Sequence, residues 1–206
     1  MLIAVRDLAA AARMMEERHG LASVEGGRHA GWGTANRIVP LGSTYIELIA
    51  VVDRDEAASS AFGRWVAAAG DASAMPLGWA VRTPDLDEVA GRLALDVAGG
   101  SRATADGRLL TWRVAGVEDA AADPSLPFFL EWGKDAPFPG RASAAHRDPD
   151  VRMTGLRVRG DADRLRAWVG GEALPVAVDT GPPALTSVAL RGTDGELLLD
   201  AERLDH

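Results

Sequence analysis

The sequence predicts an α+β fold made of repeated βαβββ units. Three short apolar segments carry this prediction, because each ends in Val-Arg and leads into a turn that contains an aspartate: residues 2–8, 78–83 and 155–160. The valines of these pairs, Val5, Val81 and Val158, lie 76 and 77 residues apart. A nearly constant period of this length indicates that one supersecondary unit occurs three times.

A helix is expected after each Val-Arg pair. Apolar residues recur there at the three- and four-residue spacing of a buried helix face: Leu8, Ala11, Ala12 and Met15; Leu86, Val89, Ala90 and Leu93; and Leu165, Trp168 and Val169. Asp85 and Asp161 precede the second and third helices. An aspartate at this position accepts the free amide protons of the first helical turn.

Strand-like stretches follow each helix. They are residues 22–25, 34–40 and 44–51 in the first unit, 102–105, 108–114 and 127–132 in the second, and 174–178, 185–191 and 196–200 in the third. Asp106-Gly107 and Asp194-Gly195 are sequences typical of hairpin turns. Each unit therefore has the order β-α-β-β-β.

The remaining segments divide the chain into three parts. Residues 57–69 form an extra amphipathic helix, residues 70–76 a linker, and residues 133–150 a second linker rich in proline and glycine. The expected domains are a first module with the extra helix at 1–70, a second module with its linker at 71–150, and a third, related unit at 151–206.

The composition excludes several classes of function. The formal net charge is −8, which argues against binding to nucleic acid or to an anionic membrane, since both need a basic surface. The chain has no cysteine, so disulfides and thiolate sites are excluded. No signal peptide and no apolar run of about 20 residues is present, and a cytoplasmic location is expected.

Two longer motifs resemble a known family. The first is Gly26-Gly27-Arg28-His29 with Gly33-Thr34-Ala35-Asn36 and Tyr45-Ile46-Glu47-Leu48, and the second is Leu126 to Trp132. Together they resemble glyoxalase-like proteins of the vicinal oxygen chelate superfamily, which includes glyoxalases, bleomycin-resistance proteins and dioxygenases. The resemblance covers residues 1–132 well and 133–206 more loosely. It implies that two modules form a curved, cup-shaped sheet around a small-molecule pocket, with the third unit appended.

The resemblance also implies where a divalent metal would bind, namely on the first and fourth strands of each module. Glu47 and Glu131 match the fourth-strand positions. Strand alternation places Glu47 on one face with Tyr45, and Glu131 with Phe129, so we expect the two carboxylates to face each other across one cavity. The first-strand histidine would fall before Met1, and its second-module counterpart falls on Gly78. No cofactor is therefore assigned, and if a metal binds, its ligands are Glu47 and Glu131.

The candidate catalytic residues are Glu47, Glu131 and His29. His29 lies in a glycine-rich segment and is either an acid–base group or a turn histidine bonded to backbone. The candidate substrate-binding residues are the aromatic and polar groups expected near the pocket: Trp32, Asn36, Arg37, Tyr45, Trp65, Arg82, Phe129, Trp132 and His146. Only one of Asn36 and Arg37 can reach the pocket, because they lie on opposite strand faces. Trp32, Trp65 and Trp132 are expected at the pocket mouth, and Trp79 and Trp168 in the core.

Two classes of function remain open. The first is an enzyme of the lyase, isomerase or dioxygenase type that uses Glu47 or Glu131 as a base on a small organic substrate. The second is a metal-free protein that sequesters an antibiotic or metabolite without catalysis. A degenerate relative kept for interaction only is a weaker third. The expected partner is a small molecule, and an odd third unit leaves a sheet surface that a second copy in a homodimer would cover.

Overall fold

The computed structural model describes residues 1–70, 74–103, 109–134, 136–193 and 195–200. The first unit comprises β1 (Leu2–Val5), α1 (Leu8–His19), β2 (Val24–His29), β3 (Thr34–Leu41) and β4 (Thr44–Val51), followed by α2 (Arg54–Ala58) and α3 (Ala61–Ala68). The second comprises β5 (Ala74–Gly78), β6 (Ala80–Arg82), α4 (Leu86–Leu93), β7 (Val97–Ala103), β8 (Leu109–Ala115), α5 (Val117–Ala122) and β9 (Phe128–Trp132), followed by the 3₁₀ turn η1 (Pro139–Arg141). The third comprises β10 (Arg152–Arg159), α6 (Ala162–Trp168), β11 (Val176–Asp179), β12 (Ala184–Gly192) and β13 (Gly195–Asp200).

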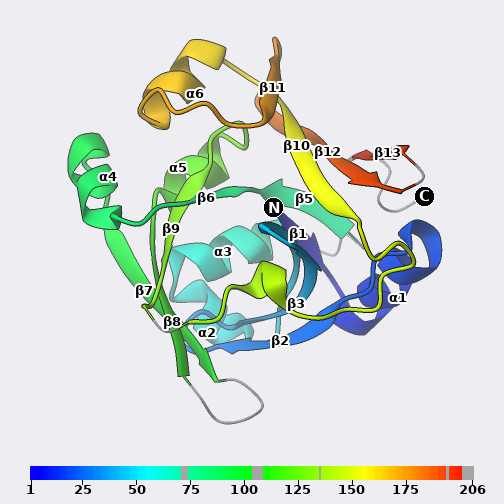
Figure 1. Cartoon of the computed structure of the whole chain (residues 1–206). Helices are drawn as coiled ribbons and strands as arrows, with labels where there is room; N and C mark the ends of the chain where they lie inside the picture. The colour runs from blue at the N-terminus through cyan, green and yellow to red at the C-terminus, as the bar shows by residue number, and fades with distance from the viewer. Residues whose placement is uncertain (71–73, 104–108, 135, 194, 201–206) are drawn as a thin grey trace.

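The strands form three sheets, and β5 of the second unit joins the sheet of the first (Figure 1). Their orders are β2-β3-β4-β1-β5, β6-β9-β8-β7 and β11-β10-β12-β13. Only Trp79 separates β5 from β6, so these strands connect the first two sheets along one edge. At the opposite edge, Ala30 N donates to Ser101 O over 3.3 Å and brings β2 beside β7. The first two sheets therefore curve around a common interior, which confirms the predicted fold class of repeated modules and a cup.

Aspartates cap three of the helices. Asp85 accepts a backbone amide proton at the first turn of α4, as predicted, and Asp7 and Asp161 do the same for α1 and α6. Gly20 ends α1 in the left-handed conformation with φ of 69°, which a glycine adopts without strain. The repeated helix of the βαβββ unit is thus fixed by local sequence.

Several predicted boundaries differ from the structure. The helix expected at 57–69 is two helices, because the hydroxyl of Ser60 accepts from Gly63 N at 2.9 Å and starts α3 separately from α2. Residues 74–76, expected in a linker, belong to β5, and strand β7 begins at Val97 rather than at residue 102. Helix α5 was not predicted from the sequence. The predicted turns at Asp106-Gly107 and Asp194 lie outside the described residues.

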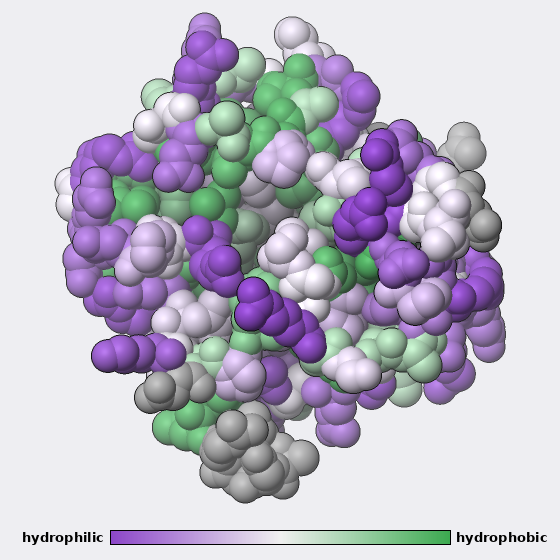
Figure 2. Space-filling view, in the orientation of Figure 1, coloured by the Kyte–Doolittle hydropathy of each residue, from purple (hydrophilic) through white to green (hydrophobic). Residues whose placement is uncertain are grey.

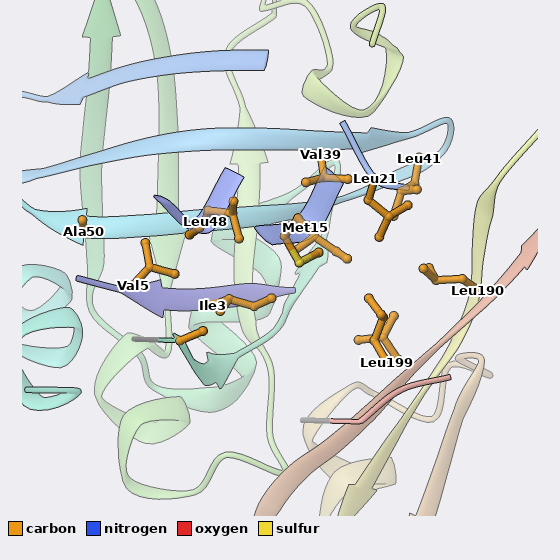
Figure 3. Packing of buried hydrophobic residues seen from close by; sticks show 14 residues of the cluster. Ile3, Val5, Met15, Leu21, Val39, Leu41, Leu48, Ala50, Leu190 and Leu199 are labelled. Atoms are coloured by element: carbon orange, nitrogen blue, oxygen red, sulfur yellow. The ribbon is translucent and has the colours of Figure 1, made fainter. Parts of the chain in front are cut away.

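The third unit packs against the first through a shared apolar core. Val188, Leu190 and Leu199 of its sheet join Met15 and Leu48 in one buried cluster (Figure 3). A second cluster connects Leu165 and Val158 of this unit to Trp79 of the second module. The third unit therefore has packing partners within the chain, while Leu197 and Leu198 of β13 remain exposed. Within the described residues, no helix is long and apolar enough to cross a membrane.

Candidate functional site

A cavity of about 360 Å³ lies inside the curved first two sheets, and all three units contribute to its wall. This volume is at the lower end of the range for small-molecule sites. Aromatic residues form much of the wall: Trp32, Tyr45, Phe62, Trp79, Trp112, Phe128, Trp132 and Phe138. The third unit contributes residues 153–156 of β10 and Glu172, Leu174, Pro175 and Val176. Figure 2 shows hydrophobic surface across the upper middle of this side of the molecule, with hydrophilic residues around it.

Glu47 lies on the cavity wall. It stands on β4 opposite Leu2 of β1, and its side chain is only 12% exposed. The Asn36 amide donates to Glu47 Oε1 over 2.6 Å. Burial raises the pKa of Glu47 above its ordinary value, and the Asn36 hydrogen bond and the Arg102 charge oppose this shift. The carboxyl group therefore keeps a proton to higher pH than an exposed glutamate does.

His29 lies beside Glu47 and is buried among aromatic rings. Its ring centroid is 6.0 Å from that of Trp32 and 5.3 Å from that of Trp112, both in edge-on contact. His29 Nδ1 is 2.9 Å from the Thr34 hydroxyl, and Nε2 is 4.0 Å from Glu47 Oε1. Burial and the nearby Arg102 charge lower the pKa of His29 to about 4. His29 is therefore neutral near pH 7 and forms no ion pair with Glu47.

Arg102 is a cavity residue that the sequence analysis missed. It lies on β7, is 9% exposed, and donates to the Gly26 carbonyl. Burial lowers its pKa, while the charge of Glu47 and the phenol of Tyr45 raise it. Strand alternation within the predicted strand at 102–105 was the only signal for it, and it does not distinguish an inward from an outward arginine.

The Gly-Gly pair of the first motif makes room for these side chains. A Cβ atom on Gly26 would lie 1.8 Å from Asn36 Oδ1, so only glycine allows Asn36 to reach Glu47. Gly27 has φ of 149°, and a Cβ there would approach the Arg102 guanidinium and the carbonyl of Ala103. The two glycines thus leave the space that Asn36 and Arg102 of the cavity wall occupy.

Five of the predicted substrate-binding residues line the cavity: Trp32, Asn36, Tyr45, Arg82 and Trp132. The Arg82 guanidinium carbon lies 4.7 Å from the centre of the Phe138 ring, and the Tyr45 ring centre is 5.7 Å from it. Phe138 therefore connects the segment after β9 to two of these side chains.

Glu131 does not face Glu47, so that prediction is wrong. Arg113 binds Glu131 at 2.5 Å and also pairs with Asp87 on α4 at 2.9 Å, on the helix side of the second sheet. Phe129 lies on the same side and packs against Leu86. The cavity is lined instead by the alternate residues of β9: Phe128, Leu130 and Trp132. Alternation correctly groups residues 129 and 131, but it does not say which strand face is the inner one.

Arg37, Trp65 and His146 are also absent from the cavity lining. Arg37 Nε donates to the Ser23 hydroxyl on the other strand face. His146 Nδ1 accepts from Ala22 N at 3.1 Å and Nε2 lies 2.7 Å from the Pro40 carbonyl, so this histidine joins the linker to the first module.

The tryptophans differ in part from the expected arrangement. Trp65 packs against Phe128 with ring centres 5.9 Å apart. Both Trp32 and Trp65 are only 7% exposed and belong to the buried cluster, so they are not at the mouth. Trp79, expected in the core, is buried and also lines the cavity. Trp168 packs beside Phe129, and its indole N–H donates to the Pro127 carbonyl over 2.8 Å.

The residues around Glu47 do not fit a divalent metal. Catalytic metal sites usually have three protein ligands, and in the described part of the chain no three His, Asp or Glu side chains converge. A Cβ atom on Gly78, the second-module ligand position, would lie 2.7 Å from the Trp65 ring. The indole therefore occupies the space that a metal-binding side chain would need. Glu131 lies on the other face of its sheet, and among the His, Asp and Glu side chains of the described residues only His29 is near Glu47.

Comparison with known proteins shows the family to which this chain belongs. The sequence profile of the glyoxalase-like domain matches residues 1–171, and the chain belongs to this family. The predicted glyoxalase-like family is thereby confirmed.

Two solved structures are similar to this chain to different degrees. A hypothetical protein from Staphylococcus aureus superimposes with a TM-score of 0.61 at 13% identity, covering 85% of this chain and 83% of that chain. Methylmalonyl-CoA epimerase from Mycobacterium tuberculosis gives a TM-score of 0.45 at 19% identity, covering 66% of this chain and 85% of that chain. No curated protein matches the sequence.

Proposed function

We propose that the cavity binds a small, partly apolar organic molecule. The observation that carries this proposal is the combination of an aromatic wall with buried polar atoms that have no partner. Within the described residues, four such atoms belong to residues of the cavity wall, namely Asn36 Oδ1, Thr44 Oγ1, Trp79 Nε1 and Trp132 Nε1, whereas Ser187 Oγ lies elsewhere. A buried polar atom without a partner costs about 1–3 kcal/mol. A ligand that brings hydrogen-bonding groups, with small side-chain adjustments, would offset part of that cost.

The test uses N-phenyl-1-naphthylamine, a neutral fluorescent probe of apolar sites. Ala80 lines the cavity on β6, and Ala80→Phe would fill part of it. Ala98→Phe is the matched control, because Ala98 is exposed on β7 and is not part of the cavity wall. We expect the wild type and Ala98→Phe to bind the probe equally, and Ala80→Phe to bind it about tenfold more weakly. Absence of binding, or equal binding by all three proteins, would contradict the proposal.

The surroundings of Glu47 favour a second candidate, catalysis of proton transfer. The ionised Glu47 carboxylate would take a proton from a carbon next to a carbonyl group of the bound molecule, which leaves an enolate. The protonated carboxyl would then return a proton to that carbon or to the enolate oxygen. A carboxyl group whose pKa is raised by burial is better matched to such a reaction near neutral pH than an exposed one. The cation of Arg102 in the same cavity would stabilise the enolate charge.

Deuterium exchange tests this candidate without knowledge of the substrate. A panel of small carbonyl compounds with an acidic C–H bond is incubated with the protein in deuterium oxide and followed by proton NMR. We expect Glu47→Gln to abolish the exchange and Glu131→Gln to preserve it, because Glu131 is held by Arg113 outside the cavity. A wild type without exchange on any compound favours the alternative of a sequestering protein without catalysis. Equal rates in wild type and Glu47→Gln would exclude Glu47 as the base.

A further inference from the structure

We infer that the ligand is an organic acid, whose anionic group binds Arg102 and Arg82 while its apolar part contacts the aromatic wall. This inference rests on the proposed binding function and names the class of ligand. Carboxylates and sulfonates share the required chemistry, a negative charge with several acceptor oxygens.

Arg102 is the main observation. It is 9% exposed, and among the described residues its hydrogen-bond acceptor is the Gly26 carbonyl, with no carboxylate within ion-pair distance. A guanidinium has five N–H donors in a planar arrangement that matches a carboxylate or sulfonate. The Gly26 carbonyl binds at Nη1, on one side of this group. Buried charges are normally paired, because removing them from water is costly. An anionic ligand would be such a partner.

The position of Arg102 makes it accessible to a ligand. Arg102 lines the main cavity and also a neighbouring hollow that contains Glu25, Leu110 and Arg141. It therefore lies in the wall between two spaces, together with Ile38, Phe138 and Pro139.

Arg82 provides a second cation in the same cavity. It is exposed and lies over the Phe138 ring, and no carboxylate of the described chain is within ion-pair distance of it. Burial raises the pKa of Tyr45, and the charges of both Arg102 and Arg82 oppose this shift. Both guanidinium groups are therefore within electrostatic range of the same phenol, from the buried side and from the exposed side.

The acidic groups of the cavity do not cancel these charges. The lining contains two glutamates, Glu47 and Glu172. Burial disfavours the ionised form of Glu47, and Glu172 is exposed, where water screens its charge. The interior around Arg102 is therefore favourable to an anion, although the whole chain carries a formal net charge of −8.

Two fluorescent probes with the same aromatic rings, one neutral and one anionic, distinguish the contribution of ligand charge to binding from that of ligand shape. 8-Anilinonaphthalene-1-sulfonate is N-phenyl-1-naphthylamine with an added sulfonate. We expect Arg102→Met to weaken binding of the sulfonate probe about tenfold, since a hydrogen-bonded charge is lost, and to change binding of the neutral probe less than about twofold. Arg82→Met has the same selectivity with a smaller effect. Arg37→Met is the matched control and changes neither, because Arg37 bonds Ser23 away from the cavity.

A competition experiment on the wild type keeps the inference testable if Arg102→Met does not fold. Octanoate and octanol have the same chain length, and octanoate should displace the neutral probe at lower concentration at pH 7. Equal displacement by the two, or unchanged sulfonate binding in a folded Arg102→Met variant, would overturn the organic-acid inference and leave the proposed binding function intact. If the neutral probe does not bind at all, the binding function itself fails.

Discussion

Burial shifts the pKa values of Glu47 and His29 in opposite directions, and in both residues it favours the neutral form. It raises the pKa of the carboxyl group and lowers the pKa of the imidazole to about 4. The closest atoms of the two side chains are 4.0 Å apart. A neutral histidine has no charge to attract the carboxylate, so the Asn36 amide at 2.6 Å is what orients Glu47.

The pKa of His29 predicts a loss of stability in acid. The folded protein has a lowered pKa of about 4 against 6.5 for the ordinary histidine, so below 6.5 the unfolded chain binds a proton that the folded chain does not. Unfolding is then favoured progressively down to pH 4, by on the order of 3 kcal/mol. His29→Phe should flatten this part of the profile, measured by urea unfolding at pH 7.5, 6 and 5. Parallel profiles for the two proteins would contradict the assignment.

Glu47 predicts the reverse dependence. Its folded pKa lies above the ordinary value of 4.5, so its contribution to stability is complete below that value and is lost as the pH rises through the folded pKa. Glu47→Gln keeps the acceptor for Asn36 and removes the charge, and it should raise the free energy of unfolding at pH 8.

Glu131→Gln is the matched control, with the opposite sign. It removes a partly exposed ion pair with Arg113 and should lower stability by roughly 0–1 kcal/mol at the same pH. Thermal unfolding of the two variants beside the wild type measures both effects. A lower midpoint for Glu47→Gln would show that its charge stabilises the fold.

The sequence predicted the residue types of the site better than their directions. The first motif correctly predicted four residues of the cavity wall, namely Glu47, Asn36, Tyr45 and His29. Its two glycines, Gly26 and Gly27, leave room for neighbouring side chains. Glu131 was misplaced, because alternation assigns residues to a shared face without identifying the inner one. That choice depends on where α4 packs, with Asp87 binding Arg113, and this contact is long-range.

At the scale of elements, glycine has opposite effects on stability in helices α3 and α4. Gly63 of α3 packs on backbone, since a Cβ atom there would lie 2.5 Å from the carbonyl oxygens of Ala57 and of Trp32. Gly91 of α4 is exposed, and a Cβ there would meet nothing within 4 Å. One glycine permits close packing and the other only weakens its helix.

We therefore predict opposite results for two identical substitutions. Gly63→Ala should destabilise the protein by about 1–3 kcal/mol through overpacking. Gly91→Ala should stabilise it by about 0.5–1 kcal/mol, because alanine loses less conformational entropy in a helix. Chemical denaturation followed by circular dichroism measures both. The packing argument fails if Gly63→Ala is as stable as the wild type.

Elements with strong local signals were predicted, and those defined by tertiary contacts were not. Apolar spacing predicted α1, α4 and α6, and Asp85 was also predicted as the cap of α4. Strand β5 contains Pro76 and ends in Gly78, a composition typical of a linker, and its strand conformation comes from pairing with β1. Proline is tolerated there because β5 lies at the end of its sheet.

At the scale of the whole molecule, the core is continuous between the first and third units. Leu190 of β12 is fully buried in the same cluster as Leu48 of β4. The repeat predicted three units along the sequence, but it did not predict that the third would share a core with the first. A shared core favours cooperative unfolding of the two units.

The substitution Leu190→Ala tests whether the first and third units unfold together. This change should cost about 2–5 kcal/mol and shift a single unfolding transition seen equally by tryptophan fluorescence and by far-ultraviolet circular dichroism. Most of the tryptophans lie outside the third unit, at positions 32, 65, 79, 112 and 132, with only Trp168 within it. A transition that splits, with fluorescence unchanged in midpoint, would show that the third unit unfolds independently.

The division of the cavity wall between units has a consequence for how this architecture diversifies. Glu47 and His29 of the cavity wall belong to the first unit, whereas Leu174 and Val176 of the same wall belong to the third. Mutations in the third unit can therefore alter the shape of the cavity while Glu47 and His29 stay unchanged. A gene that acquired a further copy of its own repeat would in this way gain a second, separately variable part of a cavity wall, and a protein engineer could vary residues 172–176 while keeping the first unit constant.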